Sequence, residues 1–393
     1  MKDFEISSVS YAYPAVPSDD RAELATSLGP VSTALTRLSE AGISSFILST
    51  CLRIEIAIPG SLERLDDSLQ ILFGDVPKPP GTIQRSGADA VEHIFRIVSG
   101  LESPVVGERE VLVQFRHAAL DAAKHGGAKG TFVGVLDSAI ATARSVREEL
   151  PADPRRSMAA VAAGLTAPAD RVAVFGHGEM GRSVAEALLD LPHKPTVEVY
   201  VRRPELIASN QVIIKPLSEA PSALATTPAV ISATSAKTRL IPADELAVLL
   251  ASRSEPLIMV DMAMPPDFSP PQGAAIEYHD IDHLATLAKD HMPEGRADEI
   301  VSNAAEEFLH KIWAGRRTGH LIEHLFDQAD EAVDEVVDRL AGKLTAPEDR
   351  ALLEQAARTA AHKVLHRPVR YLSGNGTDDA AAIAAAFGVG LDD

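Results

Sequence analysis

The sequence predicts a multidomain α/β protein in which an α+β domain is followed by a doubly wound parallel-sheet domain and a C-terminal α-helical domain. Three observations predict this organisation. Segments in the order β-α-β-β-α open the chain over residues 4–73, a strand–glycine loop–helix unit occupies 171–189, and long amphipathic helices follow residue 281. A chain of 393 residues is long enough for two or three cores. We expect domains at 1–150, 151–282 and 283–393, with a Pro-containing linker after residue 150.

Composition narrows the class of protein. The net charge of −19 argues against non-specific nucleic-acid binding, which needs a basic footprint. No apolar run is long enough for a bilayer span, and the N-terminus lacks the pattern of a signal peptide. A single cysteine excludes an intramolecular disulfide and a cysteine-based zinc site. We therefore expect a cytoplasmic protein without a membrane segment.

The first domain is predicted to open as a ferredoxin-like split βαβ unit. Asp19 and Asp20 are suited to cap its first helix. The expected elements are strands at 4–12, 43–48 and 53–58 and helices at 21–41, 61–73, 88–101 and 131–149.

The only cysteine, Cys51, lies at the turn between two of these strands. Residues 53–58 alternate, with three isoleucines on one face. If that register reaches back to the turn, Cys51, Arg53 and Glu55 share the other face. A guanidinium beside a thiol lowers the thiol pKa and favours a nucleophilic thiolate. The alternative is a small buried hydrophobic residue without a chemical role.

His93 is the second candidate for chemistry. The helix over 88–101 has one apolar stripe, and His93 lies opposite it with Asp89 and Arg96. This placement leaves two interpretations, an exposed histidine without a role or a proton-transfer group.

A dinucleotide site is predicted after the strand 171–175. The loop Gly176-His177-Gly178-Glu179-Met180-Gly181 joins this strand directly to an apolar helix. The first glycine allows the tight turn, the second lets the pyrophosphate approach the backbone, and the third packs helix on strand. The helix N-terminus favours the anion.

The end of the next strand, 196–201, indicates which dinucleotide binds. NAD-binding proteins carry an acidic residue there, whereas this chain has Arg202 and Arg203. Two guanidinium groups suit a 2′-phosphate and favour NADP; the alternative is a solvated arginine pair. Strands at 229–233 and 257–261 would complete a Rossmann-like parallel sheet.

The C-terminal helices carry two apolar stripes that need partners. A closed intramolecular bundle and a dimer interface are both compatible with them, and the scarcity of other elements favours a dimer. The stripes are Ile300, Val301, Ala304, Phe308 and Ile312, and then Ile322, Leu325, Phe326, Ala329, Val333, Val336, Val337 and Leu340.

Blocks in order along nearly the whole chain resemble the glutamyl-tRNA reductase family. The matching blocks are S-T-C-L-R-I-E at 49–55, H-I-F-R-I-V-S-G-L-E-S at 93–103, G-E-R-E-V-L-V-Q at 107–114, G-H-G-E-M-G at 176–181, R-R-P at 202–204, V-D-M-A-M-P-P-D at 260–267 and H-K-V-L-H-R-P at 362–368. This chain has Leu52 where the family has Asn, and Glu110 where it has Gln. His177 and Pro266 also replace the family's Ala and Arg.

The resemblance implies a V-shaped homodimer with catalytic, NADPH-binding and helical dimerisation domains along a long helix. Its chemistry reduces glutamyl-tRNA(Glu) to glutamate-1-semialdehyde, the first step of five-carbon-route tetrapyrrole (porphyrin) biosynthesis. Cys51 would form a thioester, NADPH would reduce it, and His93 would transfer a proton or position the ester. A transient complex with glutamate-1-semialdehyde aminomutase is implied as well. The implied substrate-binding residues are Thr50, Leu52, Arg53, Ser103, Glu108, Arg109, Glu110 and Gln114.

Two other functions stay open at this point. One is a non-catalytic paralogue that binds glutamyl-tRNA or the aminomutase, and the other is an NADP-dependent dehydrogenase of a small metabolite. A tRNA substrate also requires a local basic stripe on this acidic chain, for which the candidates are Arg144, Arg147, Arg155 and Arg156.

Overall fold

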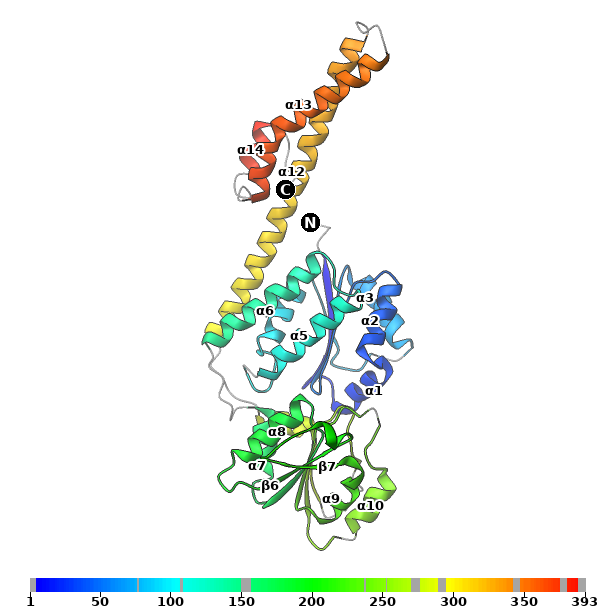
Figure 1. The fold of residues 1–393 in the computed structure, drawn as a ribbon, viewed down its shortest axis with the longest axis vertical. Helices are drawn as coiled ribbons and strands as arrows, with labels where there is room; N and C mark the ends of the chain where they lie inside the picture. The colour runs from blue at the N-terminus through cyan, green and yellow to red at the C-terminus, as the bar shows by residue number, and fades with distance from the viewer. Residues whose placement is uncertain are drawn as a thin grey trace. The chain divides into compact units, whose positions relative to one another are not determined.

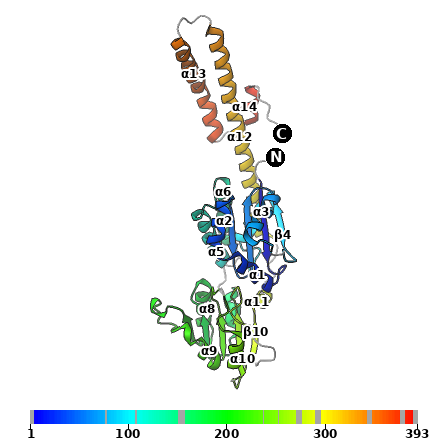
Figure 2. The same ribbon diagram turned by 90° about the vertical axis from the view of Figure 1, so that its right-hand side faces the viewer.

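The computed structural model describes residues 5–75, 78–106, 109–149, 157–236, 238–251, 253–269, 276–288, 295–341, 347–374 and 380–387. The chain forms two compact units, Met1–Ala305 and Glu306–Asp393. The first unit contains two separate sheets, the N-terminal one in blue and the second in green (Figures 1 and 2). None of the described helices is long and apolar enough to cross a membrane.

The N-terminal sheet has four antiparallel strands in the order β2-β3-β1-β4. Its strands are β1 (Ile6–Ala12), β2 (Phe46–Ser49), β3 (Arg53–Pro59) and β4 (Ile83–Ser86). Because β3 inserts between β1 and β2, the strands joined by the first helical crossover, this is the ferredoxin-like split arrangement. The fold class predicted for this domain is confirmed.

Six helices cover this sheet, and one of the helix predictions is wrong. They are α1 (Ser18–Leu28), α2 (Val31–Glu40), α3 (Leu62–Phe73), α4 (Gly87–Val98), α5 (Arg109–Lys124) and α6 (Thr131–Glu149). The single helix predicted over 21–41 is broken between α1 and α2. Gly29, with φ of +70°, ends α1, and Pro30 takes the N-cap position of α2. Asp19 and Asp20 lie within the first turn of α1 and do not cap it.

Both faces of the N-terminal sheet are covered. Helices α1–α3 lie on one side and α4–α6 on the other (Figure 1). Tyr11 of β1 meets Phe73 of α3 edge-on, with ring centroids 6.0 Å apart, while Phe46 of β2 packs against Phe115 of α5 at 4.7 Å. Polar residues of β3 that point toward α4–α6 are consequently buried in the domain interior.

The second sheet is parallel, with six strands in the order β10-β9-β8-β5-β6-β7. Its strands are β5 (Arg171–Phe175), β6 (Thr196–Val201), β7 (Ile213–Pro216), β8 (Ala229–Ser232), β9 (Leu257–Asp261) and β10 (Ile276–His279). The strand order reverses between β5 and β8, which creates the switch point where such sheets bind ligands at their carboxyl ends.

Helices pack on both faces of this sheet. They are α7 (Met158–Leu165), α8 (Glu179–Leu189), α9 (Ala220–Thr226), α10 (Ala243–Ala251) and α11 (Ile281–Ala288), with 3-10 turns η1 (Pro204–Leu206) and η2 (Leu217–Glu219). Buried residues of α7, α8 and α11 join one apolar cluster, and those of α9 and α10 join another. Successive β5 side chains, such as Val174 and Phe175, enter opposite clusters. The predicted doubly wound, Rossmann-like domain is confirmed.

The second unit is helical. Helix α12 (Arg296–Ala341) extends into it from the first unit and is followed by α13 (Pro347–Gly374) and α14 (Ala380–Ala386). Leu321 and Leu325 of α12 share an apolar cluster with Leu365 of α13 and Ala384 of α14. Part of the second apolar stripe is therefore covered within the chain, whereas Val336 of that stripe is exposed. The domain boundaries at 150/151 and 282/283 stay predictions; α11, which contacts α7, spans the second of them.

Candidate functional site

The turn that carries Cys51 is held by its neighbour Thr50. The Thr50 hydroxyl accepts hydrogen bonds from the backbone N–H groups of Leu52 and Arg53, both at 3.3 Å, and the Thr50 N–H donates to the Arg53 carbonyl at 2.9 Å. The Tyr13 N–H fixes the Leu52 carbonyl at 2.9 Å. Cys51 itself is half-buried and is not in a disulfide. The sole cysteine thus lies on a tightly defined turn.

The guanidinium of Arg53 points away from this turn, so the expected strand register is wrong at Cys51. Strand β3 begins at Arg53, and alternation does not reach back to the cysteine. Arg53 and Glu55 do share a face: Arg53 Nη1 lies 3.4 Å from Glu55 Oε1, and Nη2 donates to the Glu102 carbonyl. Arg21 does contact the Cys51 residue, because its Nη2 donates to the Cys51 carbonyl oxygen at 3.3 Å.

Glu55 lies at the centre of a buried polar network. It was not among the site residues predicted from the sequence. Its carboxylate accepts from Ser10 Oγ at 2.9 Å and from Arg53, and it lies 3.3 Å from His93 Nε2. His93 is only 5% exposed, so the interpretation as an exposed histidine is wrong. Helix α4 contacts α6 on one side and β1 on the other, which buries the side opposite its apolar stripe. The spacing of Arg53 and Glu55, which puts both on one strand face, was the sequence signal from which this network could have been predicted.

A second acid extends this network toward α12. Burial alone would raise the pKa of Glu102, but the hydrogen bond from Arg96 Nε at 2.6 Å and the charges of Arg96, His93 and Arg53 hold it below its usual value. Arg96 Nη1 also donates to Asp298 Oδ1 at 2.6 Å. Arg96 is thereby paired with two acids, Glu102 and Asp298.

The other predicted substrate-binding residues lie in the segment after α4. Ser103 follows that helix, Glu110 and Gln114 lie on the first turns of α5, and all three are half-buried. Glu108 and the side chain of Arg109 lie outside the described residues. Contacts of this segment with the substrate therefore stay a prediction. Of the predicted basic stripe, Arg144 is exposed and Arg147 half-buried on α6, and the other two arginines lie outside the described part of the chain.

The glycine loop has the geometry expected of a dinucleotide site. Gly176 has φ of +98°, and a Cβ there would come within 2.6 Å of the Ala233 carbonyl oxygen. A Cβ at Gly181 would overlap the Gly176 carbonyl oxygen. At Gly178, the N-cap of α8, a Cβ would meet nothing within 4 Å. The first and third glycines are required by the fold, whereas the second leaves open space in front of the helix N-terminus, which fits a pyrophosphate.

The other loop residues fit the same ligand. His177 is half-buried, its Nδ1 atom is buried without a hydrogen-bond partner, and burial together with Arg182 lowers its pKa. Glu179 and Met180 begin α8, and Met180 packs on the apolar cluster. Arg202 and Arg203 are exposed directly after β6. Residues 176–181 and the arginine pair could therefore hold a phosphorylated dinucleotide.

A buried pair of carboxylates lies beside the switch point at the end of β9. Asp267 accepts from Ser232 Oγ at 2.5 Å and from Thr234 Oγ1 at 2.8 Å. Asp261 accepts from the Ala263 and Phe268 N–H groups at 3.1 and 3.0 Å. Burial, and then the charge of Asp267, raise the pKa of Asp261 to about 7. Asp261 lines a cavity of about 160 Å³. The sequence block at 260–267, which contains both aspartates, was the signal from which this carboxylate pair could have been predicted.

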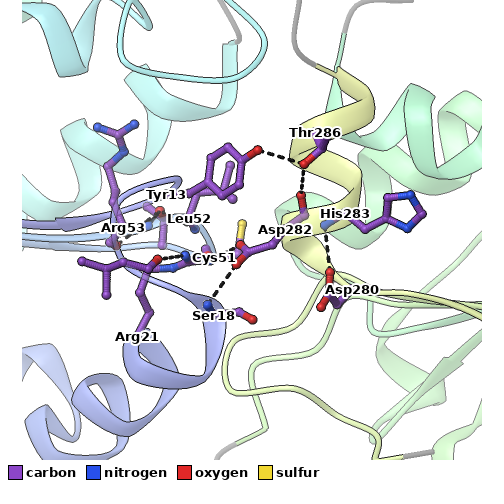
Figure 3. A network of polar contacts seen from close by, with 12 residues as sticks. Tyr13, Ser18, Arg21, Cys51, Leu52, Arg53, Asp280, Asp282, His283 and Thr286 are labelled. Carbon is purple, nitrogen blue, oxygen red and sulfur yellow. Dashed lines mark hydrogen bonds and ion pairs between the residues drawn. The ribbon is translucent and has the colours of Figure 1, made fainter. Parts of the chain in front are cut away.

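Helix α11 of the nucleotide-binding domain lies against the Cys51 turn (Figure 3). Asp282 Oδ1 pairs with Arg21 Nη2 at 2.5 Å, and Thr286 Oγ1 lies 3.0 Å from the Tyr13 hydroxyl. Leu52 belongs to the apolar cluster of the nucleotide-binding domain, and Cys51 packs against it. No local sequence pattern indicated these contacts, since Arg21 and Asp282 are far apart in the chain.

Three family models match successive parts of the chain. Residues 9–150 match "Glutamyl-tRNAGlu reductase, N-terminal domain". Residues 159–287 match "Shikimate / quinate 5-dehydrogenase", and residues 296–388 match "Glutamyl-tRNAGlu reductase, dimerisation domain".

Similar proteins named glutamyl-tRNA reductase cover much of the chain. The protein from Methanopyrus kandleri is 31% identical over 288 residues, covering 68% of each chain. The protein from Rubrobacter xylanophilus is 28% identical, and the match covers 82% of this chain and 81% of that protein. The protein from Myxococcus xanthus is 27% identical, and the match covers 98% of this chain and 94% of that protein. A solved structure of the Methanopyrus kandleri reductase aligns with 96% of this chain and 99% of its own, at 23% identity and a TM-score of 0.46. On the identity and coverage of the Methanopyrus kandleri sequence and the order of the family domains, the chain belongs to the glutamyl-tRNA reductase family.

Proposed function

We propose that this protein reduces glutamyl-tRNA(Glu) to glutamate-1-semialdehyde with NADPH, through a thioester on Cys51. The observation that carries the proposal is the position of Cys51, on a defined turn that packs against the apolar cluster of the dinucleotide-binding domain. A nucleophile with a buried acid–histidine pair in its own domain, and a hydride donor site in the next, is what a two-step acyl reduction requires.

In the first step the Cys51 sulfur attacks the ester carbonyl carbon. A C–S bond forms, the C–O bond to the tRNA breaks, and the tRNA hydroxyl takes up a proton. His93 is the candidate donor of that proton, because Glu55 lies 3.3 Å from its Nε2 atom and can orient the ring. For the second step, residues 176–181 with Arg202 and Arg203 would hold NADPH, which would supply a hydride to the thioester carbon. The C–S bond would then break, releasing the aldehyde and the Cys51 thiolate.

Arg53 is proposed to bind the substrate carboxylate. Its guanidinium already bonds to Glu55 and to the Glu102 carbonyl, and a guanidinium has five N–H donors. The remaining donors are available for a substrate carboxylate, with Thr50 and the segment 103–114 completing the pocket. Because Arg53 is held by two partners, it would meet the substrate in a fixed orientation.

NADPH, rather than NADH, is proposed as the donor. The support is the exposed pair Arg202 and Arg203 at the end of β6, where a 2′-phosphate would lie. We also propose a homodimer formed through residues 296–388, which match the dimerisation domain. The transient complex with the aminomutase and the cytoplasmic location remain proposals, the latter supported by the single cysteine.

One assay tests the proposed reaction. Purified protein is given glutamyl-tRNA and NADPH, and both semialdehyde and an acyl group trapped on Cys51 are measured. Cys51→Ser should abolish both, while Ser49→Ala, an exposed hydroxyl at the end of β2, should leave both unchanged. Reduction that survives in Cys51→Ser would rule out the thioester. Reduction of a small metabolite but not of glutamyl-tRNA would identify a dehydrogenase instead, and no reduction at all would identify a binding paralogue.

A further inference from the structure

We propose that Arg21, Asp282 and Leu52 form a clasp that holds the Cys51 turn on the nucleotide-binding domain, and that this clasp serves hydride transfer but not acylation. The proposal rests on the proposed function. Arg21 and Asp282 belong neither to the proposed substrate-binding residues nor to the dinucleotide loop, so they are positioning residues. Leu52, which the family resemblance places among the substrate-binding residues, enters the clasp only through its packing on α11.

Arg21 is buried and has a partner in each domain. Its side chain is 1% exposed, and its guanidinium donates to the Val16 carbonyl at 2.5 Å, to the Cys51 carbonyl at 3.3 Å and to Asp282 at 2.5 Å (Figure 3). A buried guanidinium needs a counter-charge. Among the residues that the structure describes, the carboxylate paired with Arg21 comes from α11 of the nucleotide-binding domain, so this ion pair requires that the two domains stay together.

Asp282 has a second partner at the start of α1. Its Oδ2 atom accepts from the Ser18 N–H at 2.9 Å. The N-cap position of α1 is Pro17, which makes no side-chain cap, and the first N–H groups of a helix attract a negative charge. One carboxylate of the nucleotide-binding domain therefore caps α1 and neutralises Arg21, and α1 is the helix that carries the contact to the Cys51 carbonyl.

Leu52 supplies the apolar part of the clasp. It is 7% exposed and belongs to the cluster that contains Ile281 and Leu284 of α11 and Met262 after β9. The family has Asn at this position; in this chain an apolar side chain fits because its surroundings are the other domain's core. The backbone of Cys51 is thus held through Arg21 while its next neighbour is anchored in the nucleotide-binding domain.

The two steps of the reaction differ in what they need. Acylation uses Cys51, His93 and Glu55, all from the catalytic domain. Hydride transfer also requires the dinucleotide of the second domain to reach the thioester carbon, at a separation of about 3–3.5 Å between reacting atoms. Loosening the clasp should therefore impair reduction and leave thioester formation intact, so that water consumes the thioester and releases glutamate.

The test compares Asp282→Asn with the wild type. Single-turnover release of tRNA without NADPH should stay within about twofold, while the ratio of semialdehyde to glutamate formed with NADPH should fall at least about tenfold. Asp282→Glu, which keeps the charge, should restore part of the ratio. Asp280→Asn is the matched control, because Asp280 caps α11 through the His283 N–H at 2.8 Å and asparagine caps equally well.

A second measurement does not depend on catalysis. Loss of the clasp should speed alkylation of the half-buried Cys51 by iodoacetamide several-fold in Asp282→Asn but not in Asp280→Asn. An unchanged product ratio, an equal loss of tRNA release and reduction, or unchanged alkylation would each overturn the clasp. A wild-type protein that forms no semialdehyde would instead refute the proposed function, and the alkylation result would still decide whether the clasp exists.

Discussion

His93 Nε2 lies 3.3 Å from Glu55 Oε2, and the other oxygen of that carboxylate accepts from Arg53 and Ser10. All four side chains are buried. Glu55 therefore both pairs with Arg53 and can orient the imidazole, so the proposed substrate-binding and proton-transfer groups share one residue. In a low-dielectric interior such a network is stable only when its donors and acceptors are paired.

Glu55→Gln removes that charge while keeping one acceptor oxygen. Because the buried Arg53 then lacks its paired carboxylate, we expect the free energy of unfolding to fall by about 3 kcal/mol. Release of tRNA should slow by about 100-fold, since His93 loses the partner that orients it. Urea unfolding followed by circular dichroism and single-turnover tRNA release measure the two effects.

The control for this variant is Glu63→Gln, which changes an exposed acid in the first turn of α3. Its effect on stability should stay within about 0.5 kcal/mol. If Glu55→Gln proved as stable and as active as this control, Glu55 would have no role in holding either Arg53 or His93.

Local patterns predicted most strands of both sheets because those patterns are local in origin, but the short strands β4, β7 and β10 were not predicted. The alternation after Cys51 predicts β3, and the apolar run before Gly176 predicts β5. The error over 21–41 came from treating an apolar periodicity as one helix, although Gly29 and Pro30 are the residues that end and restart a helix. Their turn chemistry outweighs the periodicity.

The site was predictable only where chemistry follows from neighbouring residues. Cys51 and the glycine loop could be identified, and so could His93, but not its burial, because a second layer of protein on the polar side of α4 leaves no mark in that helix's own pattern. The pairing of Arg21 with Asp282 joins residues from two domains, and a single sequence contains no signal for such a contact. The same holds for the packing of Leu52.

The loop glycines should separate fold from ligand binding. Gly178→Ala should change stability by less than about 1 kcal/mol, because its Cβ would meet open space. The same methyl group would occupy the space in front of the α8 N-terminus and weaken NADPH binding at least about tenfold. Gly181→Ala should instead destabilise the domain by about 2 kcal/mol or more, since its Cβ overlaps the Gly176 carbonyl oxygen. Thermal unfolding measures the stability of both variants, and calorimetric titration measures their NADPH binding. NADPH binding by Gly178→Ala at wild-type strength would contradict a pyrophosphate site at the α8 N-terminus.

The arginine pair should determine the choice of dinucleotide. Replacing both Arg202 and Arg203 by alanine removes two charge-assisted hydrogen bonds to a 2′-phosphate, so NADPH affinity should fall about 100-fold while NADH affinity changes less than about threefold. Lys194→Ala removes an exposed cation that precedes the amino end of β6, opposite the arginine pair, and should change neither the NADPH nor the NADH affinity. Titration calorimetry with each dinucleotide measures this, and an equal loss for both would show that the pair does not read the 2′-phosphate.

The carboxylate pair Asp261 and Asp267 should make stability depend on pH. Burial, with the charge of Asp267, raises the pKa of Asp261 from 3.8 to about 7 in the folded protein, which therefore binds this proton more tightly than the unfolded chain. The resulting stabilisation, on the order of 3 kcal/mol, is complete below about pH 4 and is lost as the pH rises through about 7. Asp267→Asn removes the neighbouring charge, so the loss should become smaller and shift to lower pH. Unfolding measured from pH 4 to 8 tests this, with Asp244→Asn, an exposed acid of α10, as control. Identical pH profiles for Asp267→Asn and the wild type would show that the two carboxylates are not coupled.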